Sequence, residues 1–194
     1  TIKDSSGAIT TDSGLDGPGG VYVDTINNEI GVTNGGASNS ITIYDRLDDI
    51  NDPTNHPSKP LRTIQGPTTG LSTPCGIAVY NDEIFVANNH NNSITVYNRT
   101  DDSKVTNGAP TVDVTPKRII QGPTTGLSRV CGLFVDANEI AVANSGSNSI
   151  TYYPRTANST TTLQGVYPLR TITGADTGLS APVGLYLDQT NGEI

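Results

Sequence analysis

The chain has 194 residues, a formal net charge of −8 and 34% hydrophobic residues, a share within reach of a globular core. The acidic balance argues against nucleic-acid binding, because such proteins concentrate Lys and Arg on one face, and no apolar run approaches the roughly 18 residues of a membrane span. With 21 Gly, 12 Pro and no Met or Trp, the composition predicts many short strands joined by turns rather than helices.

Two series of glycines reveal an internal repeat. One series precedes Leu and the other opens an apolar run, and both step by 56, 56 and 52 residues: Gly14, Gly70, Gly126 and Gly178, then Gly20, Gly76, Gly132 and Gly184. A fixed period of this length indicates an array of supersecondary units within a single domain or a fragment of one. We place the repeats at about 1–62, 63–118, 119–170 and 171–194, the last incomplete.

The predicted strands follow the repeat in chain order. Inner strands are expected at 20–24, 76–80, 132–136 and 184–188. A hairpin follows each of the first three, in the stretches 27–46 (NNEIGVTNGGASNSITIYDR), 81–99 (NDEIFVANNHNNSITVYNR) and 137–155 (ANEIAVANSGSNSITYYPR). The fourth repeat continues only to NGEI at 191–194.

The second repeat shows the complete unit. Its strand-like segments are CGIAVY (75–80), EIFVAN (83–88), NSITVY (92–97) and, after a long loop, PKRIIQG (116–122). They are short, rich in β-branched residues and bounded by Asn, Asp, Gly or Pro. Four antiparallel strands in a repeated unit predict an all-β fold, a β-propeller of four-stranded blades.

The recurring motifs also resemble a known family. The patterns P-x-G-[ILV]-x-[VL]-[DY], E-I-x-V-[AT]-N and N-S-I-T-x-Y are similar to the repeats of NHL-type propellers, over essentially the whole chain. The resemblance is closest to the Asn-rich tandem form of predicted secreted bacterial proteins, in which PLRTI-x-G-x-x-TGL joins successive blades, as at 60–71 and 168–179. It implies a six-bladed ring, of which this chain supplies about three and a half blades. An irregular first connector and long loops at 47–59, 100–115 and 156–167 depart from the pattern.

A single blade cannot bury both of its faces, so equivalent apolar positions should recur where each blade meets its neighbours. The expected core set is Val21, Val23, Ile30, Val32, Ile41, Ile43, Ile77, Val79, Ile84, Val86, Ile94, Val96, Leu133, Val135, Ile140, Val142 and Ile150. Arginines recur as well, at Arg46, Arg99 and Arg155 after the third strand and at Arg62, Arg118 and Arg170 on the fourth. Their spacing among Asp and Glu predicts pairing between blades at the rim.

The two cysteines occupy the same position in consecutive repeats. If their inner strands are neighbours, Cys75 and Cys131 can come within disulfide range, which requires Cα atoms less than about 7 Å apart. The alternative is that they are small buried residues. Metal binding is disfavoured, because no CxxC pair or adjacent His cluster accompanies them.

The hairpin loops supply the candidate ligand-binding residues. These are Asn34, Asn88 and Asn144, which end second strands, and His90, which lies in the loop that the propeller fold places on the usual ligand-binding face. Hairpin capping also explains the asparagines, and a solvated loop residue explains His90. His56 lies in a different position of a different repeat, and no nucleophile or zinc arrangement accompanies either histidine.

Carboxylates recur once per repeat, and we expect those at equivalent positions to have the same local structural role. Turn formation and hairpin closure explain them better than calcium binding, because Ca²⁺ needs six to eight oxygens at one point. The set is Asp24, Asp136, Asp188, Glu29, Glu83, Glu139 and Glu193. For the acidic runs 48–53 and 100–103, solvated loop ends are the main reading and weak calcium chelation the alternative.

The symmetry of the repeat directs the functional hypothesis. Enzymes on symmetric scaffolds normally break the repeat where the chemistry occurs, and no singular polar cluster stands out. We therefore expect a non-enzymatic, extracellular or cell-surface module with a structural or interaction role, self-associating into arrays or filaments. Its expected partners are copies of itself or further blades of a longer chain, and a surface glycan or protein. The alternative is a metal-dependent hydrolase or lyase whose channel site is completed by missing blades.

The first residue bears on localisation. The chain begins at Thr1 and contains no Met, so we expect either a mature product after removal of a signal peptide or a piece of a longer protein.

Overall fold

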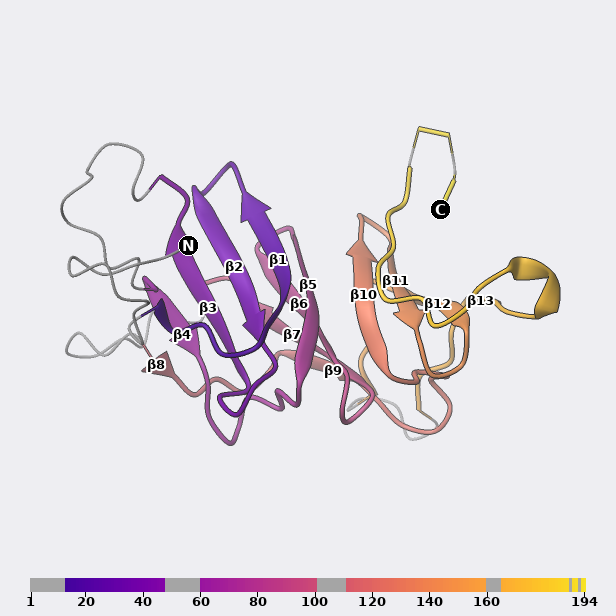
Figure 1. Ribbon diagram of the computed structural model, residues 1–194, viewed down its shortest axis with the longest axis horizontal. Helices are drawn as coiled ribbons and strands as arrows, with labels where there is room; N and C mark the ends of the chain where they lie inside the picture. The colour runs from indigo at the N-terminus through magenta and orange to yellow at the C-terminus, as the bar shows by residue number, and fades with distance from the viewer. Residues whose placement is uncertain (1–12, 48–59, 101–110, 160–164, 189, 192) are drawn as a thin grey trace.

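The computed structural model describes residues 13–47, 60–100, 111–159, 165–188, 190–191 and 193–194. These residues form three sheets that follow one another along the chain (Figure 1). Within the described residues, no helix has the length and apolar character needed to cross a membrane.

Each sheet is built mainly from consecutive antiparallel strands. The first contains β1 (Pro18–Asp24), β2 (Glu29–Asn34), β3 (Ser40–Asp45), β4 (Arg62–Ile64) and a short added strand, β8 (Thr111–Val112). The second contains β5 (Pro74–Tyr80), β6 (Glu83–Asn88), β7 (Ser93–Asn98) and β9 (Arg118–Ile120). The third contains β10 (Val130–Val135), β11 (Glu139–Asn144), β12 (Ser149–Pro154) and β13 (Arg170–Ile172). The predicted strands of the second repeat therefore lie where the sequence placed them, with the fourth shorter than expected.

The sheets are blades of a β-propeller, as predicted. Within each blade the order of strands is the order of the chain, and the first strands β1, β5 and β10 of successive blades lie next to one another. Their backbones approach closely: a Cβ atom on Gly20 would lie 2.6 Å from the carbonyl oxygen of Cys75. Gly76 and Gly132 are crowded in the same way by the backbone of the following repeat, whereas a Cβ atom on Gly184 would have open space. The close contact between blades therefore requires glycine at the first three of these four positions.

The glycines of the other series have a different role. Gly70 has φ of +72° and Gly126 has φ of +73°, a left-handed conformation that carries no steric penalty in glycine. Both lie in the connector that leads from one blade to the inner strand of the next. Repetition of the connector motif thus reflects repetition of a backbone turn.

The five-stranded first sheet differs from the predicted four-stranded blade. Strand β8 comes from the long loop of the second repeat and pairs in parallel with β4 of the first blade. Next to β8, the Asp113 carboxylate accepts hydrogen bonds from the Thr68 backbone N–H (3.0 Å) and hydroxyl (2.7 Å). The addition covers the backbone groups of an outer strand that would otherwise form an open sheet edge.

A related contact joins the second and third blades. Ser159, in the long loop of the third repeat, accepts a hydrogen bond from the Gln121 N–H and donates one to the Gln121 carbonyl, both at 2.9 Å. The described parts of the long loops 100–115 and 156–167 therefore each hold the outer edge of the preceding blade.

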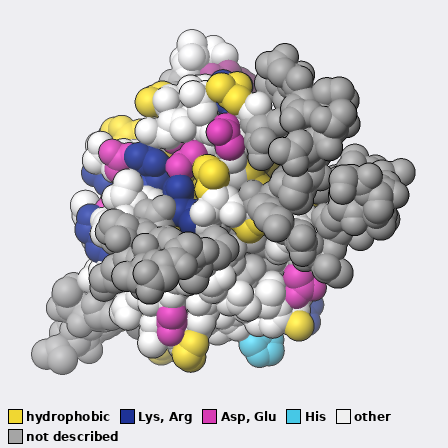
Figure 2. Space-filling view, turned by 90° about the vertical axis from the view of Figure 1, so that its left-hand side faces the viewer, with side chains coloured by type: hydrophobic (Ala, Val, Ile, Leu, Met, Phe, Trp, Pro, Cys, Tyr) yellow, Lys and Arg dark blue, Asp and Glu magenta, His cyan; other side chains and the backbone are white. Residues whose placement is uncertain are grey.

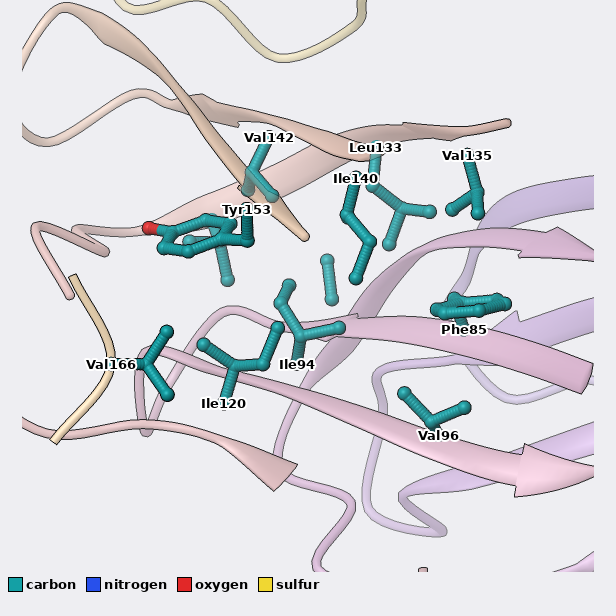
Figure 3. Packing of buried hydrophobic residues seen from close by; sticks show 12 residues of the cluster. Phe85, Ile94, Val96, Ile120, Leu133, Val135, Ile140, Val142, Tyr153 and Val166 are labelled. Atoms are coloured by element: carbon teal, nitrogen blue, oxygen red, sulfur yellow. The ribbon is translucent and has the colours of Figure 1, made fainter. Parts of the chain in front are cut away.

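The main hydrophobic core lies between the second and third blades (Figure 3). Side chains of β7 and β9 face those of β10, β11 and β12, so one core joins two sheets. Its buried residues are Phe85, Ala87, Ile94, Val96, Ile120, Val130, Leu133, Val135, Ile140, Val142, Tyr153 and Val166. A second cluster, which includes Ile41, Ile43, Ile77 and Ile84, joins the first and second blades in the same way.

The predicted core set is wrong at two positions in the first blade. Val21 and Val23 are 62% and 52% exposed, whereas Ile77 at the position equivalent to Val21 is only 9% exposed. Ile30 is half-buried. The reason is tertiary: the side chains at these positions pack against the blade that precedes their own, and no preceding blade lies on β1 among the described residues.

The described part of the fourth repeat covers part of the outer face of the third blade. Leu179, Leu185 and Leu187 pack against Ile150 and Tyr152. This segment begins with a short 3-10 helix, η4 (Ala175–Thr177), and contains one isolated bridge between Asp188 and Glu193. The repeat boundaries and the total of six blades stay predictions.

A core truncation should separate packing positions from loop positions. We expect Ile84→Ala to lower the free energy of unfolding by roughly 2–5 kcal/mol, because Ile84 is 2% exposed within the core between the first two blades. His90→Ala, at an exposed loop position, should change it by less than about 0.5 kcal/mol. Chemical denaturation measures both, and equal losses would contradict this assignment of the core.

Candidate functional site

The three asparagines predicted to bind ligand lie inside the blades. Asn34, Asn88 and Asn144 are fully buried. The Asn88 side-chain oxygen accepts a hydrogen bond from the Ser72 N–H at 3.1 Å, and its amide donates to the Thr95 hydroxyl at 3.0 Å. The equivalent bonds are present in the other two blades. These amides therefore hold the incoming connector against the blade, a role consistent with the capping interpretation.

A buried tyrosine completes this arrangement in each blade. The Tyr97 hydroxyl donates to the Thr69 carbonyl at 2.6 Å, and Tyr153 donates to the Thr125 carbonyl at 2.6 Å. Burial raises the pKa of Tyr153 to about 12, so its hydroxyl remains a neutral donor. The sequence analysis missed these tyrosines, although their recurrence in N-S-I-T-x-Y was a visible signal.

The structure does not bring the four predicted ligand-binding residues to one point. The three asparagines lie in three different blades, and His90 is exposed in the β6–β7 loop. Ligand binding by this set stays an untested prediction. His56 and the acidic run 48–53 lie outside the described residues, as do 101–103 of the second run.

The aspartates that end inner strands form turns, as expected. Asp24 accepts hydrogen bonds from the backbone N–H groups of Ile26 and Asn27 at 2.8 and 2.9 Å. Asp136 and Asp188 make equivalent bonds within their own turns. Within the described residues, no three His, Cys, Asp or Glu side chains gather in a way that could hold a metal ion.

The glutamates that begin second strands organise the rim of the molecule. Glu29 forms a two-pronged ion pair with Arg62 of the same blade, at 2.7 and 2.9 Å. Glu83 pairs with Arg118 in the same way, at 2.6 and 2.9 Å. In the third blade, Arg170 donates to Glu139 at 2.6 Å.

A second arginine reaches the same glutamate from the following blade. Arg99 of the second blade lies 3.4 Å from Glu29, and Arg155 of the third blade lies 3.1 Å from Glu83. The predicted pairing between blades is therefore present in the structure. It differs from the expected exposed pairs, because the Arg62, Glu29 and Glu83 side chains are largely buried. Figure 2 shows Lys and Arg side chains gathered beside Asp and Glu on one side of the molecule.

The electrostatics of Glu83 follow from these contacts. Hydrogen bonds from Arg118, and to a lesser extent from Lys117, outweigh the effect of burial and lower the pKa of Glu83 from 4.5 to about 2. The carboxylate is therefore ionised over the whole physiological range. It accepts four hydrogen bonds from three cationic side chains, those of Lys117, Arg118 and Arg155.

A groove with a volume of about 610 Å³ opens at this point of the rim. Its lining combines the cationic side chains with polar residues of the second and third blades: Asn81, Asp82, Glu83, Asn98, Thr100, Lys117, Arg118, Arg155 and Thr156. The sequence analysis missed Lys117 and Thr100. A signal for Lys117 was present in the sequence. The first and third repeats have a leucine at the equivalent position, Leu61 and Leu169, and only the second has a lysine.

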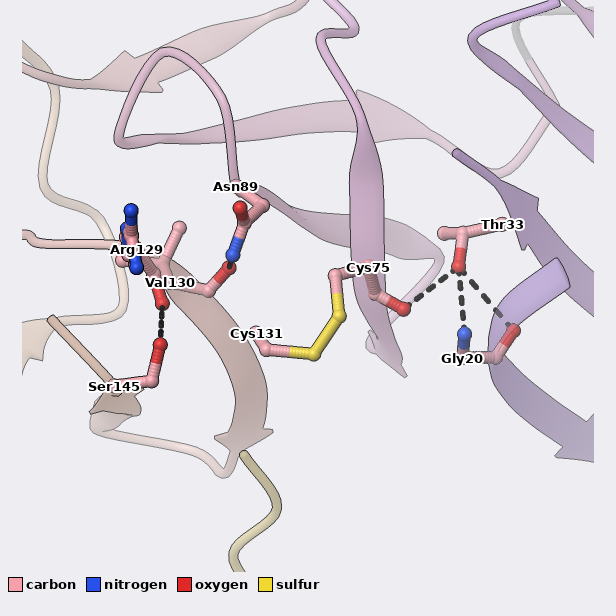
Figure 4. Close-up of a disulfide and its surroundings, with 8 residues drawn as sticks. All are labelled: Gly20, Thr33, Cys75, Asn89, Arg129, Val130, Cys131 and Ser145. Carbon is pink, nitrogen blue, oxygen red and sulfur yellow. Dashed lines mark hydrogen bonds between the residues drawn. A yellow bond between two sulfur atoms is a disulfide. The ribbon is translucent and has the colours of Figure 1, made fainter. Parts of the chain in front are cut away.

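The two cysteines form a disulfide between the inner strands β5 and β10 (Figure 4). Their Cα atoms lie 5.0 Å apart. At the boundary between the first two blades, the Thr33 hydroxyl of β2 donates to the Cys75 carbonyl of β5 at 2.8 Å. One blade boundary is therefore bridged by a disulfide between inner strands, and the other by a hydrogen bond from the second strand of one blade to the inner strand of the next.

Comparisons with known proteins support the fold alone. No model of a protein family matches the chain, and no curated protein sequence matches it. Many solved structures do. They include a functionally unknown protein from Desulfotomaculum acetoxidans, with a TM-score of 0.56 and 15% identity over 90% of this chain and 46% of the other.

Two further structures show the same kind of similarity. One is a proposed 6-phosphogluconolactonase from Bacteroides uniformis, with a TM-score of 0.58 and 15% identity over 92% of this chain and 49% of the other. The other is the computationally designed Ika4 protein, with a TM-score of 0.53 and 11% identity over 90% of this chain and 81% of the other. The chain thus spans less than half the length of both natural proteins.

The disulfide can be tested by mass. Under non-reducing conditions we expect the intact chain to be two hydrogen masses lighter than the reduced chain, because Cys75 and Cys131 are close enough to be joined. Two titratable thiols in the untreated protein would contradict the disulfide, and the fold would be unaffected.

The ion pairs at Glu83 predict a pH-dependent stability. We expect Glu83→Gln to cost about 2–3 kcal/mol at neutral pH, because three cations lose their shared carboxylate. The folded pKa is lower than the unfolded one, so the wild-type contribution is complete above about pH 4.5 and is lost as the pH falls toward 2. The difference in free energy of unfolding between the wild type and Glu83→Gln, measured by urea denaturation, should therefore narrow as the pH falls from about 4.5 toward 2.

Glu139→Gln is the matched control. Its arginine partner is 51% exposed, so we expect a loss of at most about 1 kcal/mol. An equal loss of unfolding free energy in Glu83→Gln and Glu139→Gln would show that burial of the ion pair does not contribute to its effect on stability.

Proposed function

We propose that this chain is a non-enzymatic, extracellular or cell-surface propeller with a structural or interaction role, and that it associates through the outer faces of its terminal blades. Kinship with secreted bacterial NHL-type proteins belongs to the same proposal. The observation that carries it is the repeated ion pairing between blades, which is incomplete at both ends of the described array.

At one end, an arginine has no carboxylate partner among the described residues, unlike its two equivalents. Arg99 and Arg155 reach the glutamate of the preceding blade. Arg46 occupies the same position in the first blade and donates to the Asn28 side chain at 2.7 Å. Its Nε atom is buried without a hydrogen-bond partner among the described residues.

At the other end, a glutamate lacks its second arginine. Glu139 is paired with Arg170 of its own blade, and no arginine of a following blade reaches it within the described residues. The two ends therefore have complementary charge, and the exposed Val21 and Val23 supply apolar surface beside Arg46 on the first blade. A blade face of the same type would satisfy both ends, whether it belongs to another copy or to a longer chain.

Association in trans can be tested on this 194-residue chain. We expect assemblies larger than the monomer by light scattering, and we expect Arg46→Glu to abolish them because like charges then meet at Glu139. The double variant Arg46→Glu, Glu139→Arg should restore assembly, whereas His90→Ala should leave it unchanged. A monomeric wild-type chain at high protein concentration, or failure of the charge reversal to restore assembly, would contradict self-association.

The alternative, a metal-dependent hydrolase or lyase, has no specific observation in its favour within the described residues. Elemental analysis of the purified protein would decide in its favour if stoichiometric zinc, iron or calcium were found.

A further inference from the structure

The rim groove between the second and third blades lies where the repeat is broken. At the first blade boundary, the positions equivalent to Thr100 and Lys117 are occupied by Leu47 and Leu61, which are 48% and 54% exposed. A small cavity of about 10 Å³ also lies at that boundary, lined by Glu29, Arg62 and Arg99 together with residues of the apolar core. Two leucines are thus replaced by a hydroxyl and an ammonium group in the groove between the second and third blades.

The charge of the groove is also exceptional. Lys117, Arg118 and Arg155 share the single carboxylate of Glu83, whereas Glu29 is shared by two arginines. Asp82, which also lines the groove, is paired with Arg99 at 2.8 Å. The groove is thus lined by three cationic side chains and two carboxylates, an excess of one positive charge, although the whole chain carries a net charge of −8.

Some of these cations have donors directed to solvent. The Lys117 side chain is 47% exposed, and its ammonium group, which can donate three hydrogen bonds, donates to Glu83 alone among the described residues. Arg155 is held in place by the Glu83 carboxylate, by the Ala137 carbonyl at 3.0 Å and by the ring of Tyr80. The groove therefore presents a partly exposed ammonium group beside a guanidinium group that several contacts hold in place.

We propose that this groove binds a small hydroxylated anion, of the sugar-acid class. The excess positive charge would hold its carboxylate between Lys117 and Arg155. The hydroxyls of Thr100 and Thr156 and the amide of Asn81 line the groove and supply hydrogen-bonding groups for sugar hydroxyls. A volume of about 610 Å³ accommodates a monosaccharide, and a lining made of polar and charged residues disfavours an apolar ligand.

The presence of Lys117 at one position of the groove is a departure from the symmetry of the repeat. The proposed binding does not depend on association between blades, because the groove lies within the described residues of one chain. Failure of self-association would therefore leave it unchanged.

Titration with D-glucuronate, followed by amide chemical shifts and calorimetry, tests the proposal. We expect saturable binding with shifts at Thr100, Lys117 and Arg155. D-glucose, which has the same ring without the carboxylate, and sulfate, which has charge without the sugar hydroxyls, should bind at least about tenfold more weakly. Equal binding of glucose or of sulfate, or no saturable binding of glucuronate, would overturn the proposal.

A matched pair of variants locates the site. Lys117→Leu introduces the residue that the other two repeats have, so the blade should fold normally, and a thermal scan would verify this. We expect it to weaken glucuronate binding by about tenfold or more. Leu169→Lys adds a lysine at the equivalent position of the third blade and should leave the affinity unchanged. Unaltered binding by Lys117→Leu, or an equal effect of both variants, would overturn the assignment.

Discussion

Burial of apolar surface between neighbouring blades is the constraint on which the rest of this structure depends. A four-stranded sheet has two faces, and the clusters that contain Phe85 and Ile41 each combine residues of two successive sheets. No blade therefore has a complete core of its own. This explains why the same apolar positions recur along the chain, and why the equivalent residues Val21 and Val23 are exposed where no blade lies beside them.

Polar interactions then set how each blade meets the next. Buried asparagines bind the connector that enters each blade, and the long loops bind the outer strand of the blade before their own. At the rim, each buried glutamate joins an arginine of its own blade to one of the next. Such groups cost free energy if they are left unpaired, so they favour one relative position of the blades over other apolar packings.

The departures from symmetry are the informative positions for function. A residue that serves packing must recur, because every blade meets the same environment. Lys117 and Thr100 do not recur in the first repeat, where the same positions hold leucine, and they line an open groove. Lys117 in particular occurs once, since the third repeat has a threonine (Thr156) at the position of Thr100 and a leucine at that of Lys117. A residue that occurs once is free of the packing constraint, so its chemistry can be directed at a ligand.

The sequence by itself determined the repeat period, the four strands of each of the first three blades, the turn-forming Asp24 and the connector glycines, because these depend on alternation and on local backbone conformation. It did not predict β8, and the inner strand expected at 184–188 does not form. It also predicted that Cys75 and Cys131 occupy equivalent positions, without deciding between a disulfide and free thiols. Only the tertiary structure decided which glutamate each arginine joins, since Arg99 and Glu29 are separated by 70 residues in the chain. The exposure of Val21 and the groove beside Lys117 were likewise decided by the tertiary structure, because both depend on whether another blade lies against a given face and on which side chains it presents.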